Sequence, residues 1–263
     1  MDMGVSAAEI QSGGVPAAAR PLRIGIVAGE PSGDQLGARL IRALQAVLPQ
    51  ARFEGVGGPE MKAAGCKSLF AMERLSVLGL TEILGRYLEL RRLRRELIEH
   101  FLADPPDVFI GVDSPGFNLG IEERLRAAGI RTVHYVSPQV WAWRTWRVHK
   151  IRRAGDRILV MFPFEVGFYA EHDVEAIFVG HPLADEVRGD HDPRPHRERL
   201  ELDPERRTVA LLPGSRVSEL KALADVFVQT AQWLHVRHPE LQFIAPFVNR
   251  ATRMLFEDAI RRH

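Results

Sequence analysis

The stretch Arg23–Leu44, RIGIVAGEPSGDQLGARLIRAL, decides the fold class of this chain. Its first six residues are mostly apolar and β-branched, which is typical of a buried strand. A glycine-rich turn follows, and beyond it four apolar residues recur at helical spacing: Leu36, Leu40, Ile41 and Leu44. Strand, tight turn and amphipathic helix in this order predict the opening unit of a parallel α/β sheet.

The turn Gly29–Asp34 is the first candidate site. Ligands of parallel α/β sheets bind beyond the carboxyl ends of the strands, which makes Glu30, Ser32 and Asp34 candidate ligand-binding residues. The turn matches neither G-x-G-x-x-G nor G-x-x-x-x-G-K-[ST], which disfavours a nicotinamide cofactor and a Walker-type nucleoside triphosphate. A purely structural turn is the alternative interpretation.

Composition excludes several classes of protein. The 263 residues hold 35 Lys and Arg against 34 Asp and Glu, so charge does not indicate a nucleic-acid binder. The single cysteine, Cys66, excludes an intramolecular disulfide framework and a cysteine-rich zinc site, and it fits a reducing compartment. No apolar run reaches the roughly 20 residues that span a bilayer. We therefore expect a cytoplasmic protein, soluble or peripheral to a membrane.

The pattern of strands and breaks predicts four segments. Residues 1–20 are rich in Gly and Ala and lack the features of a secretory signal, so we expect a disordered extension. Residues 21–187 predict a Rossmann-like domain, with further strands at 52–56, 107–112, 130–136, 157–160 and 176–179. The charged, proline-rich residues 188–206 predict a linker. Residues 207–263 predict an incomplete second Rossmann-like domain with two strands, at 208–212 and 241–246.

A second candidate site follows the predicted strand 107–112, where the chain reads Asp113-Ser114-Pro115-Gly116-Phe117-Asn118. A carboxylate at this sheet edge can accept the proton of a sugar hydroxyl as its oxygen attacks an anomeric carbon. Asp113 is therefore a candidate general base, and Asn118 a candidate substrate contact. In the alternative interpretation, Asp113 only caps the helix that begins near Phe117.

Two stretches combine apolar and basic residues. Trp141 and Trp143 lie two residues apart and would not share a helix face, which favours a structured loop. Beside cations such as Arg144, their flat faces suit a sugar, a phosphate or an acyl chain. Residues 76–102 combine an apolar run with a basic, strongly helical continuation, in which arginines surround an expected core stripe of Leu84, Leu88, Leu93, Leu97 and Phe101. That helix is either a solvated surface helix or a contact with anionic lipid, with Val77, Leu78 and Leu80 as its apolar edge.

Two further turns carry candidate residues. His181 precedes Pro182 and either binds a ligand, orients a hinge or is simply structural. Gly214, Ser215 and Arg216 precede a predicted helix, where amides, the positive helix end and a guanidinium suit a diphosphate. A simple N-cap at Ser215 is the alternative.

Six motifs occur in a definite order: AGEPSGD, DSPGFN, HYVSPQVWAWR, FPFE, GHPLAD and LPGSR. Together they resemble the lipid-A-disaccharide synthase family, bacterial inverting glycosyltransferases of GT-B type, from about residue 22 to the C-terminus. The resemblance implies transfer of the sugar of UDP-2,3-diacylglucosamine to the 6-hydroxyl of 2,3-diacylglucosamine 1-phosphate, a step of lipid A and lipopolysaccharide biosynthesis. It implies no cofactor and no metal ion.

The resemblance also implies roles for single residues. Asp113 matches the general base and Arg216 the arginine that contacts the diphosphate, while Glu30, Ser32 and Asp34 match an acidic turn of the acceptor domain. The tryptophan loop and the arginine-bearing helix would serve acyl chains and peripheral contact with phospholipid on the cytoplasmic face of the inner membrane. A homodimer fits the same picture.

The chain departs from the family pattern at two points. Gly116 stands where the family usually has aspartate, and the family continues past position 263 into a Ser- and Gly-rich motif, ending in glutamate, that holds uridine and ribose. We therefore expect a C-terminally truncated enzyme whose second domain exposes apolar surface. Two other hypotheses remain. The chain is a non-catalytic module that binds acylated sugar phosphate or anionic membrane, or it is another GT-B enzyme such as a non-hydrolysing 2-epimerase.

Overall fold

The computed structural model describes residues 20–75, 80–187 and 192–263. The chain divides into two compact units, one formed by Met1–Ser76 with Leu88–Pro182 and the other by Val77–Tyr87 with Leu183–His263. Apart from Arg20, the predicted N-terminal extension lies outside the described residues. Arg20 itself forms an ion pair with Asp107, at 2.6 Å.

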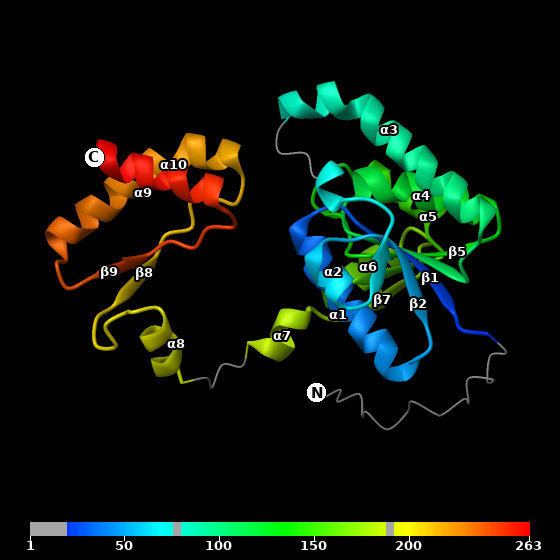
Figure 1. Cartoon of the computed structure of the whole chain (residues 1–263), viewed down its shortest axis with the longest axis horizontal. Helices are drawn as coiled ribbons and strands as arrows, with labels where there is room; N and C mark the ends of the chain where they lie inside the picture. The colour runs from blue at the N-terminus through cyan, green and yellow to red at the C-terminus, as the bar shows by residue number, and fades with distance from the viewer. Residues whose placement is uncertain (1–19, 76–79, 188–191) are drawn as a thin grey trace. The chain divides into compact units, whose positions relative to one another are not determined.

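The first unit is built on a parallel sheet flanked by helices (Figure 1). Its seven strands have the order β3-β2-β1-β4-β5-β6-β7. The strands are β1 (Arg23–Ala28), β2 (Arg52–Val56), β3 (Cys66–Ser68), β4 (Val108–Val112), β5 (Arg131–Tyr135), β6 (Arg157–Val160) and β7 (Ala176–Phe178). The chain leaves β1 towards β2 on one side and returns to β4 on the other. The ends of β1 and β4, aligned at Ala28 and Val112, therefore flank the topological switch point of the sheet.

Helices cover the sheet on both faces. They are α1 (Pro31–Val47), α2 (Pro59–Ala63), α3 (Leu80–Ala103), α4 (Pro115–Ala127), α5 (Val148–Ala154) and α6 (Pro163–Ala170), with short 3-10 helices η1 (Met72–Arg74) and η2 (Thr145–Arg147). Ile26 of β1 packs with α1 and α2, whereas its neighbour Val27 packs with α3 and α4. This alternation follows from the pleat of the strand, and it explains why β1 is apolar nearly throughout.

The sequence prediction was right about the strands and partly wrong about α3. Every predicted strand of the first unit is present, but the three-residue edge strand β3 was missed because it is too short to show a pattern. In α3, Leu93, Leu97 and Phe101 are buried as predicted, whereas Leu88 is exposed, and the side chain of Leu84 lies outside what the structure describes. Val77 and Leu78 lie outside the described residues.

The second unit holds a two-stranded parallel sheet of β8 (Thr208–Ala210) and β9 (Gln242–Ile244), as the sequence predicts. Helices α9 (Val217–Arg237) and α10 (Arg250–Arg262) pack together around Val228, Phe256 and Ala259. The predicted linker contains the short helix α8 (Arg194–Arg199), and the helix α7 (Pro182–Glu186) precedes it.

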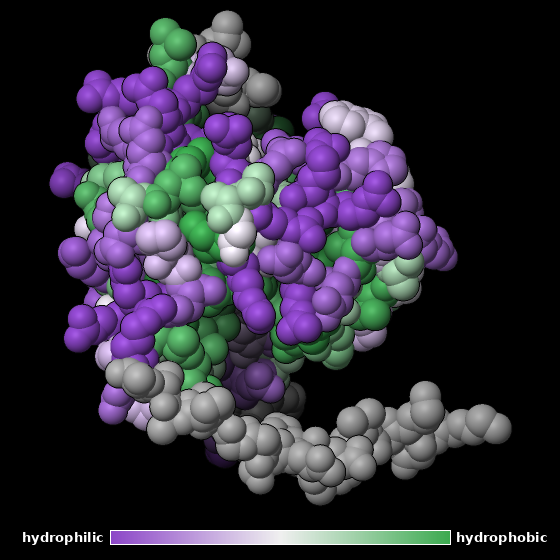
Figure 2. All heavy atoms as spheres, turned by 90° about the vertical axis from the view of Figure 1, so that its right-hand side faces the viewer, coloured by the Kyte–Doolittle hydropathy of each residue, from purple (hydrophilic) through white to green (hydrophobic). Residues whose placement is uncertain are grey.

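Charged and polar side chains cover most of the face in Figure 2, where apolar side chains emerge between them in small patches. Across the described ranges, every helix is too short or too polar to span a bilayer.

Candidate functional site

The loops after β1 and β4 lie against each other at the switch point. A Cβ atom at Gly29 would come within 2.8 Å of the Ser114 Oγ atom, and one at Gly33 within 3.9 Å of the Asp113 Cβ atom. Glycine at position 29 is therefore needed for the close approach of the two loops. The structure thus brings together the two turns that the sequence singled out.

Asp113 is half-buried at the end of β4. Its backbone and that of Ser114 have positive φ angles, 50° and 45°, in the left-handed region that non-glycine residues rarely adopt. The Asp113 amide donates a hydrogen bond to the Tyr135 carbonyl oxygen, at 2.8 Å, which ties the turn to β5. Strained backbone of this kind is concentrated at functional sites.

The side chain of Asp113 does not cap α4. The N-cap residue is Ser114, and no side chain accepts a hydrogen bond there, so the capping alternative is wrong. Within residues 20–75, 80–187 and 192–263, no hydrogen-bond donor or cation pairs with the Asp113 carboxylate. The carboxylate is thus available to a ligand at the switch point.

Asn118 supports this turn from below. Its side chain is fully buried, and its Nδ2 atom donates to the carbonyl oxygens of Val27, Val112 and Asp113 at 3.1, 3.2 and 2.9 Å. These bonds fasten the ends of β1 and β4 to each other and hold Asp113 in place. The structure gives Asn118 this positioning role in place of the predicted substrate contact, because its amide is enclosed by backbone.

Asp34 has a similar structural role. Its buried carboxylate accepts hydrogen bonds from the amides of Gly58, Glu60 and Met61, at 2.8, 3.0 and 3.0 Å. It therefore anchors the N-terminus of α2, and the predicted ligand contact does not fit its surroundings. Glu30 and Ser32 remain at the mouth of the sheet, Glu30 half-buried as the N-cap residue of α1 and Ser32 exposed.

A buried acid and base lie behind the site. The His134 Nδ1 atom is 2.7 Å from the Glu122 Oε1 atom, and both side chains are fully buried. Burial lowers the pKa of His134, but the charge and hydrogen bond of Glu122, with a further contribution from Asp113, outweigh it and raise the pKa. Gly111 makes the pair possible, since a Cβ atom there would lie 1.9 Å from Glu122. A glycine inside a buried strand was the sequence signal for this close approach.

The tryptophan segment forms a structured loop, as predicted. Trp141 and Trp143 lie in the turn before η2, both exposed, and the Arg144 guanidinium is 4.4 Å from the Trp143 ring centroid. Trp141 meets Phe164 edge to face, with ring centroids 4.9 Å apart. Phe164 was not among the predicted site residues.

His181 lies where the two units are divided. It is half-buried, follows Gly180 with a φ of 74°, and precedes Pro182, the last residue of the first unit. Ligand binding, a hinge role and a purely structural role therefore all stay predictions for His181.

The turn Gly214–Arg216 lies at the N-terminus of α9, in the second unit. The Glu219 Oε2 atom accepts hydrogen bonds from the amides of Ser215 and Arg216, at 2.8 and 3.1 Å, and Oε1 lies 3.3 Å from Arg216 Nη1. These amides, together with the Arg216 charge, lower the pKa of Glu219. The N-cap residue is Arg216, so the alternative with Ser215 as N-cap is wrong. The amides predicted to bind a diphosphate are thus engaged by a carboxylate that the sequence reasoning missed.

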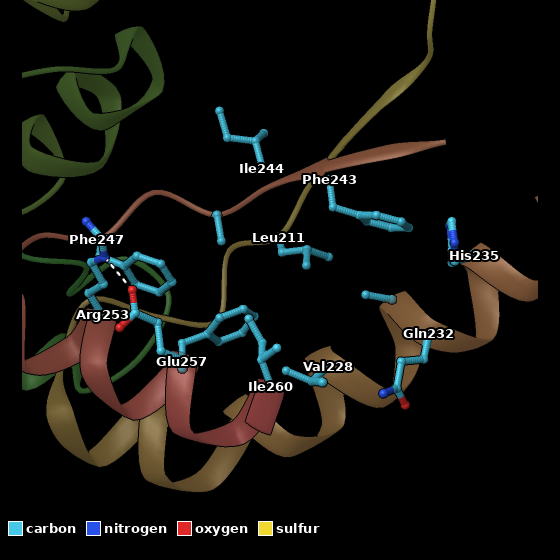
Figure 3. Close-up of a pocket in the computed structure, with 13 residues that line it drawn as sticks. Leu211, Val228, Gln232, His235, Phe243, Ile244, Phe247, Arg253, Glu257 and Ile260 are labelled. Atoms are coloured by element: carbon cyan, nitrogen blue, oxygen red, sulfur yellow. Dashed lines mark hydrogen bonds and ion pairs between the residues drawn. The ribbon is translucent and has the colours of Figure 1, made fainter. Parts of the chain in front are cut away.

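A cavity of about 700 Å³ lies in the second unit (Figure 3). Its walls are mainly apolar, with Leu211, Val228, Phe243 and Ile260 among them, and the Arg253–Glu257 ion pair at 2.7 Å is beside it. Gln232, His235, Arg253 and Glu257 also line it, whereas the site residues that the sequence predicts all lie outside its walls. In the part of the chain that the structure describes, no group of His, Cys, Asp and Glu is placed to hold a metal ion.

Solved structures with the same fold define the class of protein. A UDP-GlcNAc 2-epimerase from Neisseria meningitidis, bound to UDP-GlcNAc, has a TM-score of 0.61 at 10% identity, over 92% of this chain and 70% of that one. The glycotransferase of kitacinnamycin has a TM-score of 0.54 at 18% identity, over 88% and 66%. At these identities the likeness shows the fold alone, and it places the chain among α/β proteins of GT-B type.

Sequence relatives give the family. The profile of the family described as lipid-A-disaccharide synthetase matches residues 24–263. Lipid-A-disaccharide synthases from Aeromonas hydrophila and Hahella chejuensis are 53% and 50% identical, over 90% and 94% of this chain. The chain therefore belongs to the lipid-A-disaccharide synthase family. It spans 62% and 63% of the length of these two relatives.

Proposed function

We propose that the protein transfers the sugar of UDP-2,3-diacylglucosamine to 2,3-diacylglucosamine 1-phosphate, forming the lipid A disaccharide 1-phosphate and UDP. Family membership supports this reaction. The observation that carries the proposal is the unpaired carboxylate of Asp113 at the switch point, within the described residues. In this scheme residues 21–187 bind the acceptor, and residues 207–263 contribute to donor binding.

In the proposed mechanism Asp113 is the general base. It accepts the proton of the acceptor 6-hydroxyl as that oxygen attacks the anomeric carbon of the donor. The bond from the anomeric carbon to the diphosphate oxygen breaks on the opposite face, and UDP leaves with the electron pair and inversion of configuration. Asn118 and the Tyr135 carbonyl keep Asp113 in place, because they hold the backbone of its turn.

The leaving diphosphate needs positive charge. The Arg216 guanidinium, with the amides of Ser215 and Arg216 at the N-terminus of α9, would supply it. The diphosphate must then replace Glu219 as the acceptor of the hydrogen bonds that these two amides donate. Glu30 and Ser32 lie where hydroxyl groups of the acceptor sugar would bind, at the mouth of the sheet.

Both proposed substrates carry acyl chains, which bears on where in the cell the protein acts. We propose that the protein acts at the cytoplasmic face of the inner membrane, as a peripheral protein. The exposed rings of Trp141 and Trp143 and the adjacent Arg144 support this location, because tryptophan and arginine favour the interface between water and anionic lipid.

A mass-spectrometric assay of disaccharide formation tests the reaction. The purified chain receives both substrates in detergent, and Asp113→Asn, which keeps the size of the side chain, is compared with Asp173→Asn. Asp173 is an exposed aspartate with a positive φ of its own, and it makes a matched control. We expect product from the wild type and the control, and a loss of orders of magnitude for Asp113→Asn.

A full-length relative in the same assay gives the reference. If the relative forms product and this chain forms none, the chain does not suffice for the reaction. Unchanged turnover after replacement of the aligned aspartate in the relative would remove Asp113 from the mechanism.

A further inference from the structure

Three aromatic rings form an exposed cluster at the edge of the first unit. The side chains of Trp141, Phe162 and Phe164 are 38%, 50% and 54% exposed. Phe162 and Phe164 stack with ring centroids 5.8 Å apart, and Trp141 meets Phe164 edge to face at 4.9 Å. The rings thus pack on one another while large parts of their faces remain in water, which is typical of a surface that binds an apolar partner.

The backbone beneath this aromatic cluster is held firmly. Glu165 is buried, and its Oε2 atom accepts a hydrogen bond from the Phe162 amide, at 3.0 Å. Pro163 begins α6, and the Glu165 amide donates to the Phe162 carbonyl oxygen, at 3.2 Å. The backbone that carries Phe162 and Phe164 is therefore fixed before any ligand arrives, which lowers the entropic cost of binding.

The aromatic cluster lies near Asp113 along the sheet edge. Phe162 comes two residues after the end of β6, and β6 is separated from β4 by β5 alone. Since neighbouring strands are about 4.8 Å apart, the ends of β4 and β6 lie about 10 Å apart. A sugar bound at Asp113 can therefore place a flexible substituent on the three rings.

The charge near the cluster favours an anionic amphiphile. From Gln139 to Gly155 the chain carries no Asp or Glu. Arg152 and Arg153 pair with Asp173 and Glu123, at 3.4 and 2.8 Å, so the positive charge of this stretch comes from Arg144, Arg147 and Lys150. Arg144 lies over the Trp143 ring, at 4.4 Å. Apolar ring faces beside a cationic stretch fit a ligand that has both a hydrocarbon chain and a phosphate.

We propose that the aromatic cluster is the binding surface for an acyl chain of the sugar-phosphate acceptor. This inference rests on the proposed function, and it adds Phe162 and Phe164 to the site. The acyl chain lies on the ring faces and covers apolar area that is now in water. Acylated acceptors therefore bind more tightly than the bare sugar phosphate.

Calorimetric titration of the whole chain tests the proposal without any turnover. The probes are 2,3-diacylglucosamine 1-phosphate with short acyl chains, kept below its micelle concentration, and glucosamine 1-phosphate. The variants are Phe162→Ser/Phe164→Ser and, as a control, Trp233→Ser in the second unit. Trp233 is 54% exposed, as Phe164 is, and the Arg237 guanidinium lies 3.9 Å from its ring centroid.

We expect the double variant to bind the diacylated probe on the order of tenfold more weakly, because the acyl chain of the probe then buries less apolar area on the protein. Its affinity for glucosamine 1-phosphate stays unchanged, and so do both affinities of Trp233→Ser. Phe162→Leu/Phe164→Leu restores most of the loss. Phe164→Ser alone repeats the test if the double variant does not fold.

Three results overturn the proposal. They are an unchanged affinity of the double variant for the diacylated probe, an equal loss for both probes, and binding to phosphatidylglycerol vesicles alone, which would make the cluster a membrane contact. The test is separate from that of the reaction. If the chain is inactive but shows the expected affinities, the acyl-binding surface is supported and the reaction is not. If the chain is active but lacks the expected affinities, the reaction is supported and the acyl-binding surface is not.

Discussion

The Oε2 atom of Glu219 lies 2.8 Å from the backbone nitrogen of Ser215 and accepts its hydrogen bond. The same oxygen accepts from the amide of Arg216. A carboxylate thus sits on the amides that a diphosphate would use, and its negative charge opposes that of the ligand. The Glu219 carboxylate therefore competes with an anionic ligand for the amides at the N-terminus of α9.

Glu219→Gln should strengthen UDP binding. The amide side chain still accepts hydrogen bonds, but it removes a negative charge from the anion site, where such a charge changes the free energy by about 0.3–1 kcal/mol. We expect about a threefold gain in affinity by calorimetry, falling with added salt. Glu240→Gln, an exposed glutamate of the same unit that pairs with His238, serves as the control. Weaker binding by Glu219→Gln would show that the carboxylate holds the turn in its binding form.

The same contact makes stability depend on pH. The amides of Arg216 and Ser215 hold the pKa of Glu219 below its ordinary value of 4.5. A carboxyl with a depressed pKa in the folded state stabilises the protein above its unfolded pKa, and this contribution is lost as pH falls through the folded pKa. The wild type should therefore lose more thermal stability than Glu219→Gln on going from neutral to acid pH. Parallel profiles of melting temperature against pH would contradict this.

The buried pair of Glu122 and His134 predicts a strong coupling. Removing either partner leaves a buried polar or charged group unpaired, so Glu122→Ala and His134→Ala should each lower the free energy of unfolding by about 3 kcal/mol. The double variant should cost clearly less than the sum of the two. Urea unfolding of the four proteins, followed by tryptophan fluorescence, measures the coupling. Additive losses would mean that the two side chains act independently.

Gly116 offers a site for stabilisation. It is the second residue of α4, a Cβ atom there meets nothing within 4 Å, and Arg94 Nη2 lies 2.7 Å from its carbonyl oxygen. The negative charge of an aspartate here would interact favourably with the positive end of the helix dipole and with Arg94. The substitution would also reduce the conformational freedom of the unfolded chain. We expect a gain of about 1 kcal/mol in the free energy of unfolding. Gly167→Asp, in the interior of α6 and equally unobstructed, shares only the effect on the unfolded chain and should give a smaller gain.

Sequence patterns found the strands and the turns after them, because apolar runs and glycine-rich breaks are local signals. They placed Asp113 at the carboxyl end of a strand, since the end of a strand is visible in one stretch of chain, whereas the switch point there follows from the strand order. They did not reveal that Asp34 binds the amides of α2, 24 to 27 residues away, nor that Glu122 meets His134 across two elements. Such contacts depend on how separate elements pack, and a single sequence shows them only indirectly, as in Gly111.

The apolar cavity of the second unit predicts self-association of the chain. Ile260 is 54% exposed and lines this cavity together with Val228 and Phe243 (Figure 3). Exposed apolar surface of this kind is covered by association when nothing else covers it. Sedimentation velocity should therefore show a mass that rises with concentration, and Ile260→Lys should reduce the rise by placing a charge in the interface. Val236→Lys changes a residue of α9 that is 78% exposed but does not line the cavity, and it should have no effect. A monodisperse monomer at all concentrations would show that this surface is stable in water.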